Sequence, residues 1–451
     1  MDYGTGNLLA QAAMIGFVPF CLVLFFFLKP VRAAAIGLVT GFLLLPNTSF
    51  DFVGIPDWDK VAAMTVGVMA TAFVFDSSRF LRFRLKPVDI PVLLLIFSSG
   101  LSSFINDQGI WDATSSIFAF SVRWGGPWFL GRVYFGTALG QRELATAIIE
   151  GAILYIPLLL LEVKLSPIFH SRIYGVQLLT IKHAKRGLLW RPNVFIEHGL
   201  MCALFIALAT VLAYFLWTSG SRRKILGMPM AVVTALLGVM TIGCSSSMAL
   251  VVMLIGITIL SLGRRVAFTL PLLLMVLVPP TYVTMRQFGG WEGRELHSIA
   301  KAGFGEARAG SLMVRLRSET ELRDRAQLRK WFGYSDERTF TGNISRDLEV
   351  QGGEFVVIDS MWMWFMGLQG VFGVTALYGT LLLGGWLAWR RVPSRYWGNP
   401  ITGMPVVMAM VAVLYAQDTL LNANPNQLFI VVAGAATGSL ASRNQRRTLG
   451  L

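Results

Sequence analysis

The stretch "LLWRPNVFIEHGLMCALFIALAT" (188–210) passes from tryptophan, arginine and proline into a long apolar run, with Glu197 and His198 near its start. A transmembrane helix needs about 20 mostly apolar residues to cross a hydrocarbon core about 30 Å thick. Runs of this kind recur along the 451 residues, of which 55% are hydrophobic and only 14% charged. Because soluble domains carry about 25% charged residues, this composition predicts a polytopic membrane protein.

We expect an all-α fold with about 12–13 transmembrane helices. The apolar runs predicted as spans lie near 8–28, 31–46, 60–76, 88–105, 116–138, 144–162, 194–217, 225–243, 247–262, 266–284, 360–389, 401–420 and 426–441.

The linkers predict the orientation of these spans. "KPVR" (29–32), "SSRFLRFRLK" (77–86) and "SRNQRR" (442–447) are basic, whereas "NTSFDFVGIPDWD" (47–59) and "QDTLLNANPNQ" (417–427) are acidic or neutral. The positive-inside rule places the basic linkers and the C-terminus in the cytoplasm and the N-terminus outside. Cytoplasmic loops rich in Lys and Arg explain the net charge of +14 without a nucleic-acid partner.

Three parts of the chain are predicted from this pattern. An N-terminal transmembrane bundle of about ten spans (1–284) precedes a large outer loop (285–356), and C-terminal transmembrane helices (357–451) follow. The loop is charged but nearly balanced, and a helix is expected around 312–330, with Glu319–Arg323 and Glu321–Arg325 as i,i+4 pairs. We therefore expect a folded, partly helical cap on the outer face.

A second outer linker, 163–193, is strongly basic and contains no acidic residue. Arginine binds phosphate through two hydrogen bonds and lysine binds it as a point charge, so this loop suits a lipid diphosphate. Contact with anionic headgroups, or a different topology at this point, are the alternatives. Its basic residues are Lys164, Arg172, Lys182, Lys185, Arg186 and Arg191.

Arg191 and His198 form the first candidate pair. Pro192 suits the first turn of a helix, in which His198 would follow Arg191 by about two turns, roughly 10 Å deeper in the membrane. An ionisable group at that depth usually faces a cavity or a partner, which favours an outward-facing pocket with Arg191 on phosphate. A Glu197–His198 pair or an interhelix hydrogen bond is the structural alternative, and Glu197 is expected to have a structural place.

Two arginines, Arg123 and Arg132, lie within the fifth apolar run (116–138). Arg123 is nearer the outer side and is expected to serve the same anionic ligand, whereas Arg132 is expected to snorkel towards the cytoplasm. "GGP" (125–127) between them predicts a helix break.

Asp359 is the candidate general base, because a carboxylate at the membrane boundary can accept a proton from a sugar hydroxyl. A helix N-cap is its alternative role. "CSSS" (244–247) is expected mainly to allow close helix packing. The sequence shows no metal-ligand spacing and no nucleotide-binding motif, so we expect no metal, no cofactor and no nucleotide-sugar donor.

The order of these motifs resembles the O-antigen ligase and O-antigen polymerase superfamily of bacterial envelope enzymes. The pattern comprises "WRPNVFIEHG" (190–199), "CSSS", Arg315 with "KWFGYSD" (330–336), and "DSMWMWFMGLQGVFG" (359–373). The resemblance covers roughly residues 120–440. It implies a metal-independent membrane glycosyltransferase of the bacterial inner membrane, with its active site facing the periplasm.

The resemblance also implies roles for single residues. Arg191 and Arg315, together with Arg123, would bind the donor diphosphate, and Asp359 or His198 would be the general base. The family often has a histidine where this chain has Asp359, and its "GxG" turn is "GYS" in this sequence. Both departures favour a polysaccharide polymerase over a ligase.

The implied activity is polymerisation of undecaprenyl-diphosphate-linked repeat units into an exopolysaccharide, capsule or O-antigen. The implied partners are lipid-linked glycans, membrane lipids, chain-length regulators and export proteins. A ligase that transfers glycan to lipid A-core is the alternative within the family. A flippase of lipid-linked glycans is the alternative of another class, although such a transporter should show related halves, which this chain lacks.

Overall fold

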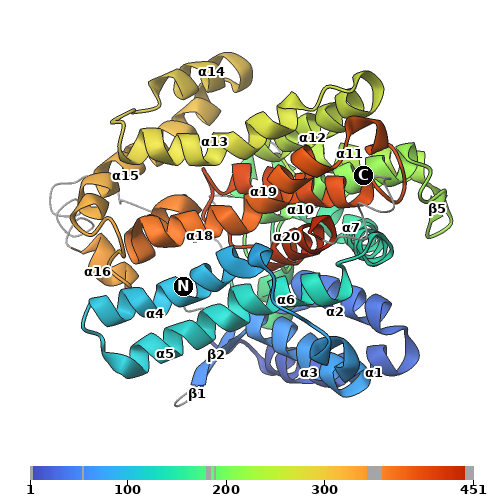
Figure 1. Cartoon of the computed structure of the whole chain (residues 1–451), viewed down its shortest axis with the longest axis horizontal. Coiled ribbons are helices and arrows are strands. Elements are labelled where there is room, and N and C mark those ends of the chain that lie inside the picture. The colour runs from blue at the N-terminus through green and yellow to red at the C-terminus, as the bar shows by residue number, and fades with distance from the viewer. Residues whose placement is uncertain (1–3, 53–54, 179–183, 187–188, 343–357, 442–451) are drawn as a thin grey trace.

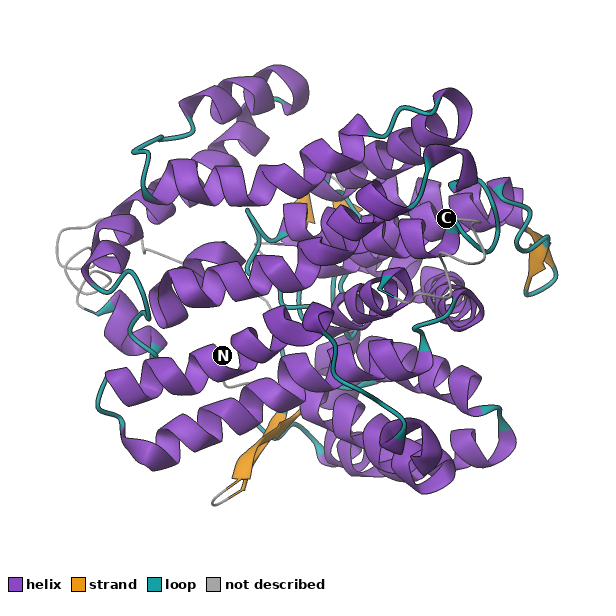
Figure 2. Ribbon diagram, viewed as in Figure 1, coloured by secondary structure: helices purple, strands orange, loops and turns teal. Residues whose placement is uncertain are grey.

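Helices dominate the protein (Figures 1 and 2). The computed structural model describes residues 4–52, 55–178, 184–186, 189–342 and 358–441, so Lys182 and the basic segment 442–447 lie outside the described residues. Strands in the described residues form three short antiparallel hairpins: β1 (Ser49–Phe52) with β2 (Ile55–Asp59), β3 (Lys185–Arg186) with β4 (Leu189–Trp190), and β5 (Lys224–Ile225) with β6 (Met228–Pro229). The all-α class predicted from the sequence is confirmed.

Each predicted apolar run falls on a helix. Seven helices in the described residues are long and apolar enough to cross a membrane: α1 (Leu8–Phe27), α3 (Lys60–Leu81), α4 (Ile90–Ile105) with the turn before it, α7 (Ala138–Leu165), α10 (Gly199–Thr218), α12 (Ser247–Val266) and α18 (Met361–Arg391). Four apolar helices are shorter: α2 (Pro30–Leu44), α11 (Met230–Gly243), α19 (Met404–Asp418) and α20 (Gln427–Leu440). The membrane character is thus supported, and the count of 12–13 spans stays a prediction.

The fifth run is not broken at "GGP". α5 (Gly109–Phe120) continues through a π-helical turn (Ser121–Gly125) into α6 (Gly126–Tyr134), with Pro127 in the first turn of α6, where it has no N–H to lose. Arg132 also differs from its prediction: it does not snorkel. Its Nε and Nη2 donate to the two carboxylate oxygens of buried Asp89 at 2.6 and 3.0 Å. Asp89 therefore balances the charge of Arg132 within the protein, and the side chain does not need to reach the aqueous phase.

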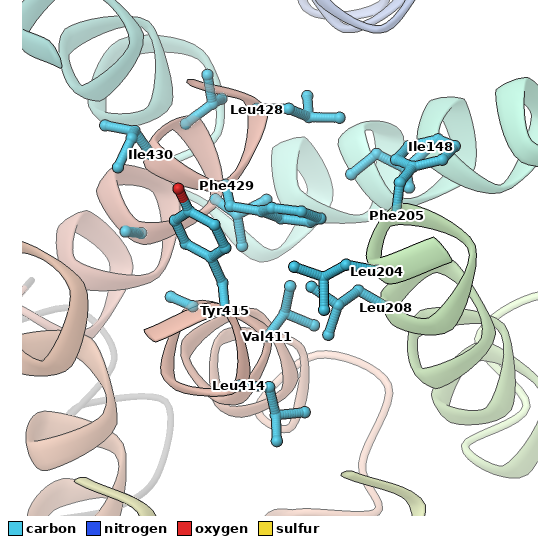
Figure 3. Packing of buried hydrophobic residues seen from close by; sticks show 14 of the residues in the cluster. Ile148, Leu204, Phe205, Leu208, Val411, Leu414, Tyr415, Leu428, Phe429 and Ile430 are labelled. Atoms are coloured by element: carbon cyan, nitrogen blue, oxygen red, sulfur yellow. The ribbon is translucent and has the colours of Figure 1, made fainter. Parts of the chain in front are cut away.

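α10 lies at the centre of the bundle and is buried on all sides, which explains why its sequence is apolar all round. Side chains from α7, α10, α19 and α20 meet in this core (Figure 3). The rings of Tyr415 and Phe429, for example, have centroids 5.2 Å apart. α20 packs on α6 and α18 packs on α4, so helices from both ends of the chain share one core.

The segment after α13 (Leu270–Gln287) contains α14 (Arg294–Phe304), α15 (Glu306–Leu328) and α16 (Glu337–Thr341). α15 confirms the helix predicted around 312–330. In Figure 1, α15 and α16 lie at the left edge and β5 lies at the right edge, so this segment and the basic linker 219–224 occupy opposite ends of the molecule. We call the end of the molecule that contains α15 and α16 the α15 end.

A buried ion pair docks α15 onto the bundle. Arg286 Nε at the end of α13 binds Glu319 Oε2 at 3.0 Å, with both side chains nearly inaccessible. Tyr282 donates to the same oxygen at 2.9 Å, and the Trp362 indole donates to Glu319 Oε1 at 2.9 Å. The predicted Glu319–Arg323 and Glu321–Arg325 pairs are wrong, because Glu319 faces the bundle and Glu321 pairs with Arg317 one turn earlier.

This docking predicts a strong effect of Arg286→Met on stability. Removal of the cation leaves Glu319 buried without its charge partner, which should cost about 3–5 kcal/mol of unfolding free energy. The double variant Arg286→Met/Glu319→Leu should recover much of that loss. Thermal unfolding of the purified protein in detergent measures both, and Arg294→Met is the matched control because its pair with Glu292 is exposed. Equal losses in Arg286→Met and Arg294→Met would contradict the docking role.

Candidate functional site

The predicted helix over residues 192–198 is wrong. α10 begins at Gly199, and His198 is its N-cap, with Nδ1 accepting a hydrogen bond from the Leu200 N–H at 3.0 Å. Arg191 follows the short strand β4, and the chain between Arg191 and His198 is irregular. His198 therefore lies at the helix entry rather than two helical turns below Arg191.

Glu162 explains this irregular course. Its Oε2 accepts hydrogen bonds from the backbone N–H groups of Asn193 at 2.9 Å and Val194 at 2.7 Å. Its Oε1 accepts from the Phe169 N–H at 3.0 Å. The hydrogen bonds to this fully buried carboxylate stabilise the irregular backbone more than a helix would be stabilised here. Val194 accordingly has a non-helical φ of 53°. The only signal in the sequence is a glutamate near the end of the apolar run 144–162.

The Arg191 side chain lies against the start of α10. Its Nη2 donates to the Ser245 carbonyl at 3.2 Å. A Cβ at Gly199 would approach Arg191 Cγ to 2.6 Å, so glycine is required for this close contact. Arg191 therefore links the segment before α10 to the "CSSS" segment.

Ser245, Ser246 and Ser247 form the N-terminus of α12, and we call them the serine turn. Ser246 is the N-cap and accepts from the Ala249 N–H at 3.4 Å, while Ser245 has a φ of 52°. Ser247 Oγ accepts a hydrogen bond from the guanidinium of Arg308 on α15. Two arginines from distant segments thus meet at one helix N-terminus, where backbone N–H groups and the helix dipole favour an anion.

Arg315 lies on the same face of α15 as Arg308, because seven residues are about two turns, or roughly 10 Å. Its Nε is 3.7 Å from Asp359 Oδ2, and it also interacts electrostatically with Asp418 at the end of α19. The structure therefore brings two of the predicted site residues, Arg315 and Asp359, together. Arg308 was missed in the sequence, although its spacing to Arg315 was a usable signal.

Asp359 keeps an accessible carboxylate just before α18. The N-cap position belongs to Ser360 instead, so the alternative role of Asp359 as the capping residue does not apply. Burial raises the pKa of Asp359, and the positive charge of Arg315 opposes this shift. A carboxyl group with a raised pKa is better matched to accepting a proton than an ordinary surface aspartate.

Arg123 lies at a separate cavity. Its guanidinium pairs with Asp59, the N-cap of α3, at the wall of a cavity of about 600 Å³. Glu197, Ile196 and Met201 line the same cavity, so the stretch that opens α10 does form a pocket wall, with Glu197 as its ionisable residue. The structure does not place Arg123 among the contacts of the serine turn.

Hydrogen bonds at the back of the cavity fix its shape. The Phe195 carbonyl accepts from Lys60 Nζ at 2.8 Å and from the Asn47 side chain at 2.9 Å. The Asn47 N–H donates to His170 Nε2 at 3.0 Å, and the other ring nitrogen, Nδ1, lies 2.7 Å from the Val176 carbonyl. Since Nε2 accepts, Nδ1 carries the proton, and the imidazole is neutral. Burial lowers the pKa of His170 to about 4.

This pKa predicts a stability loss in acid. The unfolded chain binds the His170 proton at about pH 6.5, whereas the folded protein resists it until about pH 4, so stability is lost as the pH falls through this window. The loss from this group should approach about 3 kcal/mol. Thermal unfolding of the wild type and of His170→Gln between pH 7 and pH 4 measures it, and a pH dependence that is identical in both would contradict the assignment.

Comparisons of the chain with protein-family models, with curated protein sequences and with solved structures found no match. Among the residues that the structure describes, no three His, Cys, Asp or Glu side chains are grouped so that they could hold a metal ion. The arrangement at the serine turn and at Asp359 therefore carries the functional argument by itself.

Proposed function

We propose that the protein is a membrane glycosyltransferase that polymerises lipid-diphosphate-linked oligosaccharide units into a surface polysaccharide. The observation that carries this proposal is the grouping of Arg191, Arg308, the serine turn, Arg315 and Asp359 at one end of an apolar helix bundle. In this proposal the α15 end faces the periplasm of a bacterial inner membrane. The resemblance of the motif order to O-antigen polymerases supports it.

The arginines and the α12 N-terminus would bind the donor diphosphate. A diphosphate requires several cationic or N–H donors, and Arg191, Arg308 and the free N–H groups of a helix start supply both kinds. Arg308 takes the place that the sequence suggested for Arg123, because Arg308 contacts the serine turn and Arg123 faces the other cavity.

In the chemical step, Asp359 would lie beside the acceptor hydroxyl. The acceptor hydroxyl oxygen bonds to the anomeric carbon, the carbon–oxygen bond to the diphosphate breaks, and its electron pair leaves with the diphosphate. The hydroxyl proton passes to Asp359. Arg315, which pairs with Asp359 in this structure, would turn towards the developing charge on the diphosphate and free the carboxylate as a base.

Alanine substitution of Arg191, Arg308 or Arg315 should abolish long-chain polysaccharide. Loss of one preorganised cation should reduce turnover by about 10²–10³-fold, because the leaving charge is then less well stabilised. Arg317→Ala is the matched control, since Arg317 is an exposed residue of the same helix that pairs with Glu321. Polysaccharide length on gels, with immunoblots of membrane fractions, measures the effect.

Normal chain lengths in the Arg191 and Arg315 variants would overturn the proposed function. Full-length glycan retained on its lipid carrier would indicate a ligase instead. Purified protein that moves a lipid-linked unit between leaflets without lengthening its glycan would indicate a flippase.

The base role predicts a specific pH profile. Activity should fall as the pH falls through the pKa of Asp359, because a protonated carboxyl group cannot accept the acceptor proton. Arg315→Gln removes the charge that opposes the upward shift, so the acid limb of its residual activity should move to higher pH, whereas Arg315→Lys should leave the limb in place. Turnover of lipid-linked units between pH 4 and pH 9 measures this, and an unchanged acid limb in Asp359→Asn would contradict it.

A further inference from the structure

The cavity beside Arg123 is separate from the arginines of the serine turn. Pro425 and Gln427 line it; Pro425 belongs to the connection from α19 to α20, and Gln427 is the first residue of α20. The start of this connection contacts the Asp359 segment, since the Met361 N–H donates to the Thr419 carbonyl at 3.0 Å. One eight-residue connection (419–426) therefore links the cavity to the proposed site of bond formation.

The charges of the cavity are largely compensated. Arg123 pairs with Asp59, and Lys60 interacts electrostatically with Glu197. Asp51 and Asp57 add two exposed carboxylates at the rim, so the lining has an excess of negative charge. An anionic ligand such as a diphosphate is disfavoured by this excess.

The neutral lining groups point to a ligand with many hydroxyls. Asn47, Thr48, Ser49 and Gln427 line the cavity next to the charged side chains, so the wall contains residues that can donate and residues that can accept hydrogen bonds. A hydroxyl group both donates and accepts, which matches such a wall at many points. The volume of about 600 Å³ lies within the range of about 300–1,000 Å³ typical of small-molecule sites.

Thr48 gives a second, independent indication of a ligand. Its side chain is only 3% exposed, and its Oγ1 has no hydrogen-bond partner among the described residues. A buried hydroxyl without a partner costs free energy, and after a rotation of the Thr48 side chain a ligand hydroxyl in the cavity would satisfy it. The carboxylates do not converge as metal ligands in the described part of the chain, which argues against a bound metal ion as the partner.

We propose that this cavity binds a neutral saccharide, and that this saccharide is the acceptor sugar of the second lipid-linked repeat unit. The second half of the proposal rests on the proposed function. Charged side chains, neutral amides and hydroxyls would hold the sugar ring by hydrogen bonds. The connection 419–426 would set the distance between the sugar ring and Asp359.

Direct binding to the full-length protein in detergent tests this proposal. The probe is a mixture of neutral oligosaccharides released by mild acid from the surface polysaccharide of the producing cells. Saturation-transfer NMR detects binding, and a titration measures the affinity. Thr48→Val removes the hydroxyl and keeps the shape, and Asp57→Asn removes the charge of an exposed carboxylate at the rim. Each should weaken binding by about 3–10-fold, the equivalent of one hydrogen bond.

Asp112→Asn is the matched control, because Asp112 is an exposed carboxylate in the first turn of α5 and does not line the cavity. It should bind as the wild type does. Absence of saturable binding to the wild type, or binding that neither Thr48→Val nor Asp57→Asn weakens, would overturn the proposal. Binding of spermidine in place of the oligosaccharides would also overturn it, in favour of a cationic ligand.

Arg315→Ala separates this proposal from the proposed function. The variant should make no polysaccharide but should still bind the oligosaccharides. If it makes polysaccharide and the wild type binds the probe, the function is wrong and the saccharide site stands. If it makes none and the wild type does not bind the probe, the function stands and the saccharide site is wrong.

Discussion

The buried carboxylate of Glu319 docks α15 onto the helix bundle. Its two oxygens accept from Arg286, Tyr282 and Trp362, which belong to α13 and to the start of α18. Burial raises the pKa of this carboxyl, and the Arg286 charge opposes the shift. The position of α15 therefore depends on one ion pair and its two ring donors, and Arg308 and Arg315 depend on the position of α15.

Glu162 has the corresponding role on the other side of the arginine group. It holds the backbone of Asn193 and Val194 in an irregular course, which lets Arg191 fold back over Gly199 towards the serine turn. A helix through this segment would have carried Arg191 away from α12. Two buried glutamates thus place arginines from segments more than a hundred residues apart around one helix N-terminus.

The structure contains two separate polar surfaces, the serine turn with its arginines and the cavity beside Arg123. The serine turn with its arginines suits a doubly charged leaving group, whereas the cavity at Asp59, Lys60 and Thr48 has compensated charges and a net negative rim. Asp359 lies beside the first, and the connection 419–426 leads to the second. This separation fits the proposed transfer reaction, since a diphosphate requires cationic groups and neutral acceptor hydroxyls do not.

The sequence by itself determined the helices and the membrane character, because the length of an apolar run is a local property and a bilayer selects it directly. It also singled out Arg191 and Asp359, which lie beside apolar runs, and Arg315, which the motif resemblance indicated. It did not show that Arg308 joins them, that Glu197 and Arg123 face another cavity, or that residues 192–198 are not helical. Only the tertiary structure decided these points, because each depends on a hydrogen bond or ion pair between segments far apart in the chain, which residue spacing does not record.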